Sequence, residues 1–461
     1  MTKTHMPAHH FLSPWLTQLR QERPQFQLHE DTSCDIAVVG AGIAGVSTAY
    51  FLLKQTSLNV LLIDAGRIAH GATGHNAGQV VSYFERPFAD IARAFGVDMA
   101  VQGQVAVESA WGLLEDIMEE CHLRTPLSDC TGYAGYSTLA QIIEHLEEQH
   151  LRAAAGLKDK PTMIKVDPDL LNRIPEHLRD HLLPLPHSVI LEALQTDDHM
   201  FIAAAVSKKG CMNSALFCEE LVAWMAANHA DRFRVVEHLP VKNISLDKEH
   251  AILSTEGPTV TAKKVVLCTN GFENFTIHNG AGPDINVSFH SSVNASIGYM
   301  AGYIDHADRS ATAISYYRER KDKPEPYHYL TRRRYERSTG EHVTLHCFGG
   351  PERALPNDAE YDRLSPFPAD VEEELDRDLR HIYRATPPFA SRTFLWHGLM
   401  GYTPNRLRRI GFEPKNKVLM YNLGCNGVGI LPSVYGGKRI AQLVSGIELP
   451  PSIFDPDKGG M

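Results

Sequence analysis

Apolar residues gather in two short runs near the N-terminus, with glycines and a longer apolar stretch between them. The runs cover 36–39 and 60–63 and are rich in valine, leucine and isoleucine. Uninterrupted apolar runs of this length predict buried strands, and the stretch from the glycines to about Gln55 is long enough for a helix. The pattern therefore predicts a β-α-β unit.

Later segments show two other periodicities. Residues 139–156 repeat apolar positions at helical spacing and end at a glycine, which predicts a helix with a glycine stop. Residues 284–300 and 326–350 contain alternating and aromatic runs, which predict strands. In the second of these, the Ser-Thr-Gly sequence at 338–340 interrupts the alternation, so we expect a hairpin with its turn there.

Composition places the chain among ordinary globular proteins. Of its 461 residues, 43% are hydrophobic and 22% are charged, which predicts two domains and argues against disorder. The 45 Lys and Arg against 55 Asp and Glu give a net charge of -10, which argues against a general nucleic-acid or anionic-membrane binder.

Cysteine usage and the N-terminus bear on the compartment. The eight cysteines contain no CxxC pair, and the first residues carry no secretory signal. We therefore expect reduced thiols and a cytoplasmic protein. The uncharged run 36–53 is long enough for a membrane span, but its glycines favour two soluble elements joined by a turn.

The glycines between the two apolar runs have the spacing of a dinucleotide-binding turn. Gly40, Gly42 and Gly45 form GxGxxG directly after the first run. In such a turn the first glycine bends the chain, the second lets the backbone approach a pyrophosphate, and the third lets helix and strand pack. Asp64 ends the second run, where its carboxylate can accept hydrogen bonds from a ribose diol. This unit leaves FAD and NAD both open.

The loop after Asp64 resembles a known family segment, and this resemblance distinguishes FAD from NAD. The sequence DAGRIAHGATGHNAG, residues 64–78, resembles the segment that follows the ribose acid in the D-amino-acid oxidase-like family of FAD-dependent oxidoreductases. By that resemblance Thr73 contacts the pyrophosphate or ribityl region, and residues 76–78 lie near the isoalloxazine ring. An NAD enzyme has no reason to carry this loop, so the resemblance implies FAD.

Two further segments support the resemblance. Residues 241–272 resemble the family's strand pair and a strand ending in a Thr-Asn turn, with the backbone of Val241 at the adenine. Residues 396–446 carry a Thr-Pro turn, a strand, a glycine-rich helix start and a closing amphipathic helix. The N–H groups of 427–429 would point at flavin N1 and the C2 carbonyl, where negative charge develops on reduction. The resemblance implies that FAD is bound by Gly40, Gly42, Ile43, Ala44, Gly45, Asp64, Ala65, Gly71, Ala72, Thr73, His75, Asn76, Ala77, Gly78, Val241, Thr269, Asn270, Gly271, Gly398, Gly424, Asn426, Gly427, Val428, Gly429 and Ile430.

The chain departs from the family pattern in two places. The Asp-Gly-Leu-Pro that usually follows the Thr-Pro turn is Asn-Arg-Leu-Arg at 405–408, and the common Gly-His-Gly is Gly-Val-Gly at 427–429. Arg406, Arg408 and Arg409 therefore make the first loop basic. Whether they face substrate, a partner or solvent stays open, and a solvated turn is the simplest interpretation.

The resemblance also implies the fold class and the domain boundaries. We expect an α/β Rossmann-like FAD-binding domain of the glutathione reductase type, interleaved with a mixed-sheet α+β substrate domain. The FAD-binding domain is expected at 30–98, 206–275 and 396–461, the substrate domain at 99–205 and 276–395, and an N-terminal extension at 1–29. Within the extension, residues 13–19 resemble the N-terminal tryptophan segment of γ-glutamylputrescine oxidase-like members.

His75 raises the question of how FAD is attached. In the dimethylglycine and sarcosine dehydrogenase branch the matching loop holds a histidine bonded covalently to the 8α-methyl group of FAD, and an ungapped alignment puts His75 there. Most other members have arginine or another residue. The alternative is that His75 only hydrogen-bonds the pyrophosphate or a carbonyl group. Gly74 stands where the linked branch has tryptophan, and Cys347, in a strand pattern, is a weaker candidate for a link.

Members of this family remove a hydride from the carbon bonded to an amine and pass it to flavin N5, after which the imine hydrolyses. Positioning matters more here than a charged base, and we find no catalytic triad and expect no metal site. Tyr329, His290 and His397 are the candidates for substrate contact, each with a packed aromatic or sheet-histidine alternative. The arginines at 332–334 could pair with a substrate carboxylate, although a solvated hairpin edge is the simpler interpretation.

These observations predict an FAD-dependent amine or amino-acid oxidoreductase that acts on a small amine. Its electron acceptor would be O2, a quinone or an electron-transfer protein. One alternative is an FAD-dependent 2-hydroxy-acid or polyol-phosphate dehydrogenase of the same fold. Another is a non-catalytic flavin-binding subunit that docks through the basic turn. We expect neither a nucleic-acid partner nor a transmembrane segment.

Overall fold

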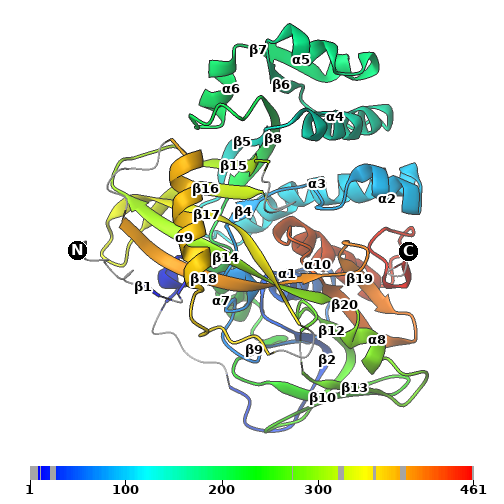
Figure 1. The fold of residues 1–461 in the computed structure, drawn as a ribbon. Coiled ribbons are helices and arrows are strands. Elements are labelled where there is room, and N and C mark those ends of the chain that lie inside the picture. The colour runs from blue at the N-terminus through cyan, green and yellow to red at the C-terminus, as the bar shows by residue number, and fades with distance from the viewer. Residues whose placement is uncertain are drawn as a thin grey trace.

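Two β-sheets divide the described part of the chain, which in this computed structural model covers residues 9–10, 12–20, 27–272, 274–319, 327–356, 360–384 and 391–458. One sheet has nine strands and the other has eleven. In Figure 1 the nine-stranded sheet lies at the bottom, and the eleven-stranded sheet runs from the centre to the top of the molecule. This arrangement confirms the α/β fold class with two interleaved sheets.

The nine-stranded sheet is the predicted nucleotide-binding sheet. Its central strands follow the order β13-β10-β11-β12-β2-β3-β9, and β20 joins β12 while β19 joins β20. Its strands are β2 Thr32–Val39, β3 Val60–Ile63, β9 Phe233–Val236, β10 Val241–Leu246, β11 Ala251–Thr255, β12 Val260–Leu267, β13 Thr276–Asn279, β19 Arg409–Glu413 and β20 Asn416–Leu423.

The predicted β-α-β unit is confirmed. Strands β2 and β3 are parallel, with Ile36 opposite Val60, and helix α1, Ile43–Gln55, connects them. The uncharged run 36–53 therefore divides between the end of β2, the glycine turn and α1. None of the helices in the described residues is long and apolar enough to cross a membrane.

The eleven-stranded sheet is mixed, as the resemblance implied. Its main order is β1-β18-β14-β17-β16-β15-β5-β8-β6-β7, with β4 beside β8. Strand β15 runs parallel to β5, whereas β14 is antiparallel to both β17 and β18. The strands are β1 His9–His10, β4 Gln79–Val80, β5 Ser128–Tyr136, β6 Thr162–Lys165, β7 Leu182–Leu185, β8 Ala203–Cys211, β14 Asn294–Asp305, β15 Thr312–Tyr317, β16 His328–Glu336, β17 His342–Leu355 and β18 Ser391–Tyr402.

The predicted hairpin is present and the strand predicted at 284–300 is only partly right. Strands β16 and β17 pair antiparallel, and Gly340 in the turn between them has φ 79°. Residues 286–290 instead form a short helix before β14 begins. The alternation there spans less than two helical turns, a length at which strand and helix patterns are hard to tell apart.

The helices of the described residues complete the fold. The predicted helix at 139–156 is confirmed, and Thr138 and Gln141 form a capping box at its start. That helix is α4 Leu139–Ala154, and the others besides α1 are α2 Phe88–Phe95, α3 Val97–Glu120, α5 Pro168–Asn172, α6 His187–Ala193, α7 Ser214–Asn228, α8 Asn286–His290, α9 Ala369–Ile382 and α10 Ile430–Val444, with 3-10 turns at Leu16–Gln18, Ala72–Gly74, Glu176–His181 and Pro456–Lys458.

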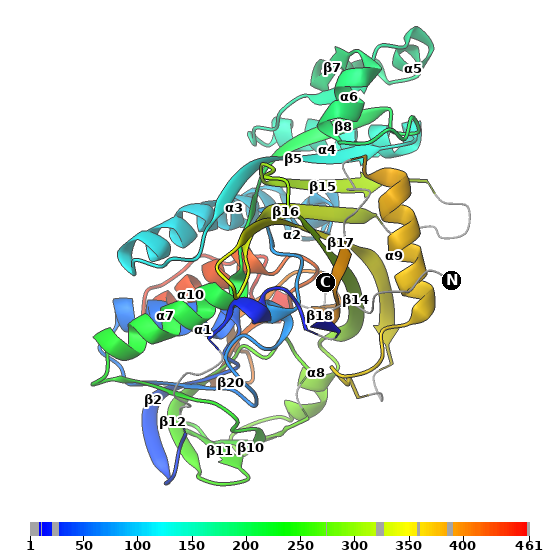
Figure 2. The ribbon, with the colours of Figure 1, turned by 90° about the vertical axis from the view of Figure 1, so that its left-hand side faces the viewer.

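The main core lies between the nine-stranded sheet and a layer of helices. Helix α1 packs against α10 and α7, and α10 packs against α3. Val46, Ala49 and Leu52 of α1 are fully buried there. On the other sheet, α9 packs against β14 and β17, and Figure 2 shows it running along that sheet.

Sheet membership differs from the expected domain boundaries. Strand β8 starts before the expected boundary at 206 and lies in the eleven-stranded sheet. Strand β4 and most of β18 fall within the expected FAD-binding domain, but both strands also lie in the eleven-stranded sheet. Strand β13 lies in the nine-stranded sheet, although 276–395 was expected in the substrate domain. Which sheet a strand joins depends on partners far away in the chain, and a local pattern of apolar residues carries no such information.

Candidate active site

A cavity of about 490 Å³ is lined by both sheets and by the turns between them. Of the residues predicted to bind the cofactor, it is lined by Gly40, Gly42, Ile43, Ala44, Asp64, Ala65, Gly71, Ala72, Thr73, His75, Asn76, Ala77, Gly78, Thr269, Asn270, Gly398, Gly427, Val428, Gly429 and Ile430. Tyr329, a predicted substrate contact, also lines it. The structure therefore brings segments from both ends of the chain to one cavity.

The glycine turn is held in place by very close backbone packing. A Cβ atom on Gly45 would lie 1.8 Å from the carbonyl oxygen of Gly40, which itself has φ +103°. A Cβ on Gly42 would lie 2.9 Å from Oγ1 of Thr73, which accepts a 3.0 Å hydrogen bond from the Ile43 N–H. Larger residues at these positions would push the helix start away from the turn.

Asp64 is fixed at the end of β3 by the neighbouring backbone. Its two carboxylate oxygens accept hydrogen bonds from the N–H groups of Ala41, at 2.6 Å, and Gly66, at 2.8 Å. Burial raises the pKa of Asp64, and these two N–H groups partly oppose the shift. The carboxylate is thus oriented at the cavity wall, as expected for a ribose-binding acid.

The N-terminal segment clamps the loop 71–78. The Trp15 indole is fully buried, and its Nε1 donates a 2.6 Å hydrogen bond to the carbonyl of Asn76. A Cβ on Gly78 would lie 2.7 Å from the Trp15 ring, and one on Gly74 would lie 2.6 Å from Leu16. Gly74 therefore leaves no room for the tryptophan of the linked branch. Residues 13–19 are a packed part of the site, although only their resemblance to relatives distinguished them in sequence.

His75 is buried in this loop and its ring is held in one tautomer. Nδ1 lies 2.9 Å from the carbonyl oxygen of Gly71, so Nδ1 carries the donated proton. Nε2 is buried and has no hydrogen-bond partner. Burial lowers the pKa of His75 to about 3, which the hydrogen bond to Gly71 only partly opposes. His75 is therefore a neutral imidazole with an unengaged Nε2 lone pair.

Two predicted substrate contacts do not line the cavity. His290 ends α8, and its Nε2 lies 2.9 Å from the carbonyl oxygen of Phe275. His397, in β18, has Nδ1 2.9 Å from the Tyr361 hydroxyl and Nε2 3.2 Å from the Ser365 carbonyl oxygen. Both histidines hydrogen-bond to a neighbouring segment of the fold, so each has a structural role.

Five predicted cofactor residues also lie outside the cavity lining, and most of them have a structural role. Asn426 bonds to Thr403, with 2.8 Å between its Oδ1 and the Thr403 N. A Cβ on Gly271 would meet Val293, and one on Gly424 would meet Thr403. The five residues are Gly45, Val241, Gly271, Gly424 and Asn426.

The basic segments are buried rather than solvated at three positions. Arg332 donates to Gln195 and to the Tyr383 hydroxyl at 2.8 and 2.7 Å, and Arg333 donates to Gln18 at 2.6 Å. Arg332 and Arg333 are 4% and 3% exposed, and neither lines the cavity. Arg408 is also buried, but it does line the cavity. The solvated interpretation was wrong for these three residues, because each guanidinium has polar partners in distant segments.

Several residues of the cavity were missed in the sequence. They include Glu85 before α2, Tyr327 before β16, Glu352 in β17 and Tyr402 in β18. None forms a motif with its chain neighbours, so only the pairing of the strands brings them together. Cys347, by contrast, is fully buried away from the cavity lining, and burial raises its pKa to about 12.

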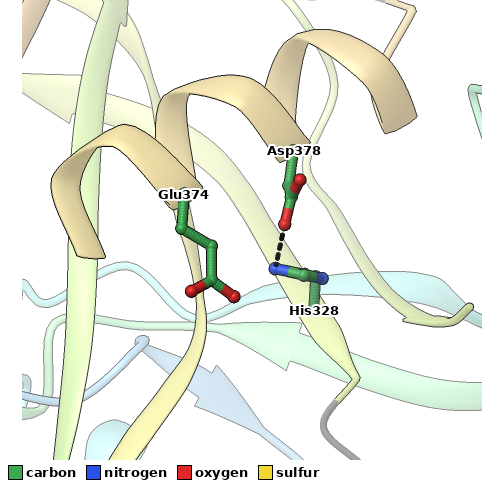
Figure 3. Close-up of side chains that lie close together, drawn as sticks. All are labelled: His328, Glu374 and Asp378. Carbon is green, nitrogen blue, oxygen red and sulfur yellow. Dashed lines mark ion pairs between the residues drawn. The ribbon is translucent and has the colours of Figure 1, made fainter. Parts of the chain in front are cut away.

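A second cluster lies under α9, where His328, Glu374 and Asp378 approach one another (Figure 3). His328 Nε2 lies 3.2 Å from an Asp378 oxygen, and the His328 ring stacks on Phe348 at 5.2 Å. One potential metal-ligand atom from each of the three residues lies within 4.8 Å of the other two. No metal site was predicted from the sequence. Because Tyr327 and Tyr329 flank His328, this ion pair anchors the strand that lines the cavity.

We expect Asp378→Asn to weaken the fold in a pH-dependent way. Burial alone would raise the pKa of Asp378, but His328 and Arg377 outweigh it and hold the pKa at about 2. Because the pKa falls below its unfolded value, this stability is present above about pH 5 and is lost as the pH falls toward 2. The variant should lose up to about 2 kcal/mol at pH 7 in urea unfolding, and the difference should shrink below pH 4. Asp370→Asn, at an exposed position on the same helix, is the control, and equal losses in both variants would contradict the assignment.

Comparisons with known proteins agree with this geometry. A family model described as DAO, FAD dependent oxidoreductase, matches residues 35–443. The gamma-glutamylputrescine oxidoreductase of Escherichia coli (strain K12) is 34% identical over 91 residues, which cover 20% of this chain and 21% of that protein. Alignments with the curated relatives span between 21% and 27% of those proteins.

Solved structures show the same fold. The crystal structure of glycine oxidase from Geobacillus kaustophilus matches with a TM-score of 0.66 and 18% identity, covering 92% of this chain and 98% of that one. L-proline dehydrogenase from P. horikoshii matches with a TM-score of 0.63 and 15% identity, covering 93% and 98%. Since the family model spans most of the chain, the protein belongs to the DAO family of FAD-dependent oxidoreductases.

Proposed function

We propose that the protein oxidises a small amine or amino acid with FAD held in the cavity. The observation that carries this proposal is the continuity of the cavity. It extends from the glycine turn and Asp64 to Tyr329 and Glu352 on the eleven-stranded sheet, so a nucleotide site and a separate polar compartment share one space. The names of three of the relatives, gamma-glutamylputrescine oxidoreductase, glycine oxidase and L-proline dehydrogenase, support this substrate class.

The lining fits FAD. The Thr269 hydroxyl is buried without a hydrogen-bond partner and lines the cavity, which suits a polar ligand. Gly42 lines the cavity beside Thr73, and a Cβ on Gly42 would lie 2.9 Å from the Thr73 hydroxyl, so glycine is the residue that lets the backbone approach a pyrophosphate here. We propose that Gly40–Gly42 and Thr73 hold the phosphates, Asp64 the ribose, and residues 76–78 and 427–429 the flavin ring.

Bound FAD would supply the hydride acceptor for a carbon–hydrogen bond next to nitrogen. The chain's own residues position the substrate and exclude water. Burial raises the pKa of Tyr329, so its phenol stays protonated at neutral pH and acts as a hydrogen-bond donor and wall, not as a base. His290 and His397 have no part in this proposal, because neither lines the cavity.

Anaerobic flavin reduction tests the proposed substrate class. The purified protein should bleach with amines or α-amino acids and not with 2-hydroxy acids or glycerol phosphate. The opposite preference would favour the hydroxy-acid or polyol-phosphate alternative. A protein that binds FAD and is reduced by no compound of either panel would favour the flavin-binding subunit. Repeating the reduction and then admitting O2 or a quinone distinguishes the proposed acceptors.

We also propose that His75 forms a covalent bond to FAD through Nε2. This ring nitrogen is neutral and unengaged, and Nδ1 already donates to Gly71. Bond formation would join Nε2 to the 8α carbon with loss of a proton from that carbon, and bound FAD would supply the two-electron acceptor for this oxidation. In relatives the corresponding histidine makes this bond, and the neutral state of His75 makes it a nucleophile.

Acid precipitation tests the bond without relying on activity. We expect the yellow colour to stay in the pellet of the wild-type protein and to move to the supernatant in His75→Ala. His70→Ala is the control, since His70 also lines the cavity and its Nδ1 lies 2.9 Å from the Ile68 carbonyl oxygen. Its flavin should stay in the pellet. Wild-type flavin in the supernatant would limit His75 to a hydrogen-bonding role.

The eight cysteines are all free thiols in the structure. This state supports the proposal that the protein works in a reducing compartment such as the cytoplasm.

A further inference from the structure

Part of the cavity wall combines two carboxylates with four tyrosines. Glu85 comes from the loop before α2 and Glu352 from β17, where it pairs opposite Gly298 of β14. A Cβ on Gly427 would lie 2.9 Å from the Glu85 side chain and 3.4 Å from the Tyr402 hydroxyl, so these groups border the loop proposed to hold the flavin ring. The tyrosines are Tyr83, Tyr327, Tyr329 and Tyr402, and all six residues line the cavity.

Two of the tyrosines hydrogen-bond to the carboxylates and help to hold them in place. The Tyr327 hydroxyl donates a 2.8 Å hydrogen bond to Glu85, and the Tyr402 hydroxyl lies 3.3 Å from an oxygen of Glu352. The rings of Tyr327 and Tyr329 are 5.9 Å apart. Carboxylates surrounded by aromatic faces are a common arrangement for binding an ammonium group, because both the charge and the ring faces attract cations.

Neither carboxylate has an ion-pair partner among the residues that the structure describes. Lys209 and Arg406 lie near enough to lower the pKa of Glu85, whose net pKa is nevertheless raised by burial. Lys209 Nζ donates instead to the Ser315 hydroxyl at 3.1 Å, and Arg406 is exposed and does not line the cavity. Burial raises the pKa of Glu352 as well, and a cationic ligand beside the two groups would favour their ionised form.

The same wall offers no partner for a substrate carboxylate. Among the described residues lining the cavity, the only cationic side chains other than histidine are Arg363 and Arg408. Arg408 is engaged with the side chain and carbonyl of Asn422. The charge of Arg363 acts on Asp64 and His75, whereas it is not among the charges that act on Glu85 or Glu352. A carboxylate beside Glu85 and Glu352 would meet like charge.

We propose that Glu85 and Glu352 select a substrate that carries a second positive charge and no carboxylate on the carbon to be oxidised, so that a diamine is favoured over an α-amino acid. This inference rests on the proposed amine oxidation and narrows it. The reacting nitrogen must be neutral to release a hydride from its carbon, whereas a carboxylate stabilises the charged ammonium. The two acids therefore bind the distal, non-reacting ammonium group.

Matched substrates separate the contributions of the two charges. Anaerobic flavin reduction is measured with α,ω-diamines of three to six carbons, with 1-aminobutane, and with both enantiomers of ornithine, which is 1,4-diaminobutane carrying a carboxylate. The best diamine should show an apparent Kd at least ~10-fold below that of 1-aminobutane. The apparent Kd of ornithine should be at least ~10-fold above that of 1,4-diaminobutane. Faster reduction by ornithine or by other α-amino acids than by the diamines would overturn the inference and leave the proposed function intact.

Binding of unreactive ions tests whether this part of the cavity prefers cations, even if no compound reduces the flavin. Butyltrimethylammonium has no nitrogen lone pair and cannot be oxidised, and butanoate is a matched anion. Titrated against the flavin absorbance of the holoprotein, the cation should bind at least ~10-fold more tightly than the anion. Glu85→Gln and Glu352→Gln should each weaken binding of the cation by ~10-fold. Flavin content and unfolding temperature check that the variants are folded.

Glu115→Gln, an exposed carboxylate on α3 outside the cavity lining, is the control and should change neither affinity. Equal binding of cation and anion, or cation binding that is unaffected by both Gln variants, would overturn the inference. Selective cation binding without any flavin reduction would instead overturn the proposed function, so the two failures can be told apart.

Discussion

Gly45→Ala is expected to abolish FAD binding and to lower the free energy of unfolding by more than about 3 kcal/mol. The added Cβ would lie 1.8 Å from the Gly40 carbonyl oxygen and 3.4 Å from Leu62. The Gly40 turn cannot yield, because its N–H donates a 2.7 Å bond to the Ile63 carbonyl and the Cys268 carbonyl oxygen would lie only 2.8 Å from a Cβ on Gly40. Helix α1 cannot withdraw either, because it is buried along almost its whole length.

Flavin content after purification, the Kd for added FAD and the urea midpoint measure this effect. Gly112→Ala is the matched control, because the same methyl group meets nothing within 4 Å on α3. Replacing an exposed helical glycine should stabilise the protein by up to about 1 kcal/mol. If Gly45→Ala bound FAD as tightly as Gly112→Ala does, the close packing of turn and helix would not be required for the site.

The nucleotide-binding half of the site could be predicted from the sequence because its signals are local. The GxGxxG turn and Asp64 are positioned by neighbours within one β-α-β unit. The structure brings nearly all of these residues to the cavity together with the loop 71–78, although Trp15 and Trp396 also hold that loop. Gly45 does not line the cavity, but the structural role predicted for it is present. Its role is to let α1 approach the turn, as the spacing predicted.

The other half of the cavity could not be predicted, because strand pairing assembles it. Glu352 and Tyr402 meet only when β14 pairs with both β17 and β18, and Glu85 joins them from the loop before α2. His290 and His397 illustrate the converse error. Each lies in a segment with the expected polarity, yet each ring bonds to groups of its own neighbourhood. His397 lies in a strand, where side-chain direction depends on a register that local alternation does not determine, and His290 lies in a helix that the alternation did not predict.

The buried arginines were misjudged for a related reason. A run such as Thr-Arg-Arg-Arg has the polarity of an exposed edge, but Arg332 and Arg333 reach Gln195 and Gln18 in distant parts of the chain. A side chain of this length can bury its charge wherever polar partners have been assembled by the fold.

We expect Arg408→Met to weaken FAD binding by ~100-fold while changing the stability of the apoprotein little. Arg408 is 6% exposed and lines the cavity, and no carboxylate among the described residues pairs with it. Burial lowers its pKa to about 10, so it remains charged at neutral pH. An unpaired buried cation is costly, and the anionic diphosphate of FAD would offset that cost.

The stability of the apoprotein is expected to change little because the substitution has two opposing effects on it. Removing the guanidinium leaves the Asn422 side chain and carbonyl, now bonded at 2.6 and 2.8 Å, without donors, at about 1–3 kcal/mol for each buried acceptor. The same change removes a buried charge whose desolvation costs several kcal/mol. Titration of apoprotein with FAD and urea unfolding of the same sample measure the two quantities separately. Arg406→Met, two residues earlier and exposed, should leave both unchanged. A large loss of apoprotein stability with unaltered FAD affinity would make Arg408 a structural anchor between β20 and its neighbours, without a role in holding the cofactor.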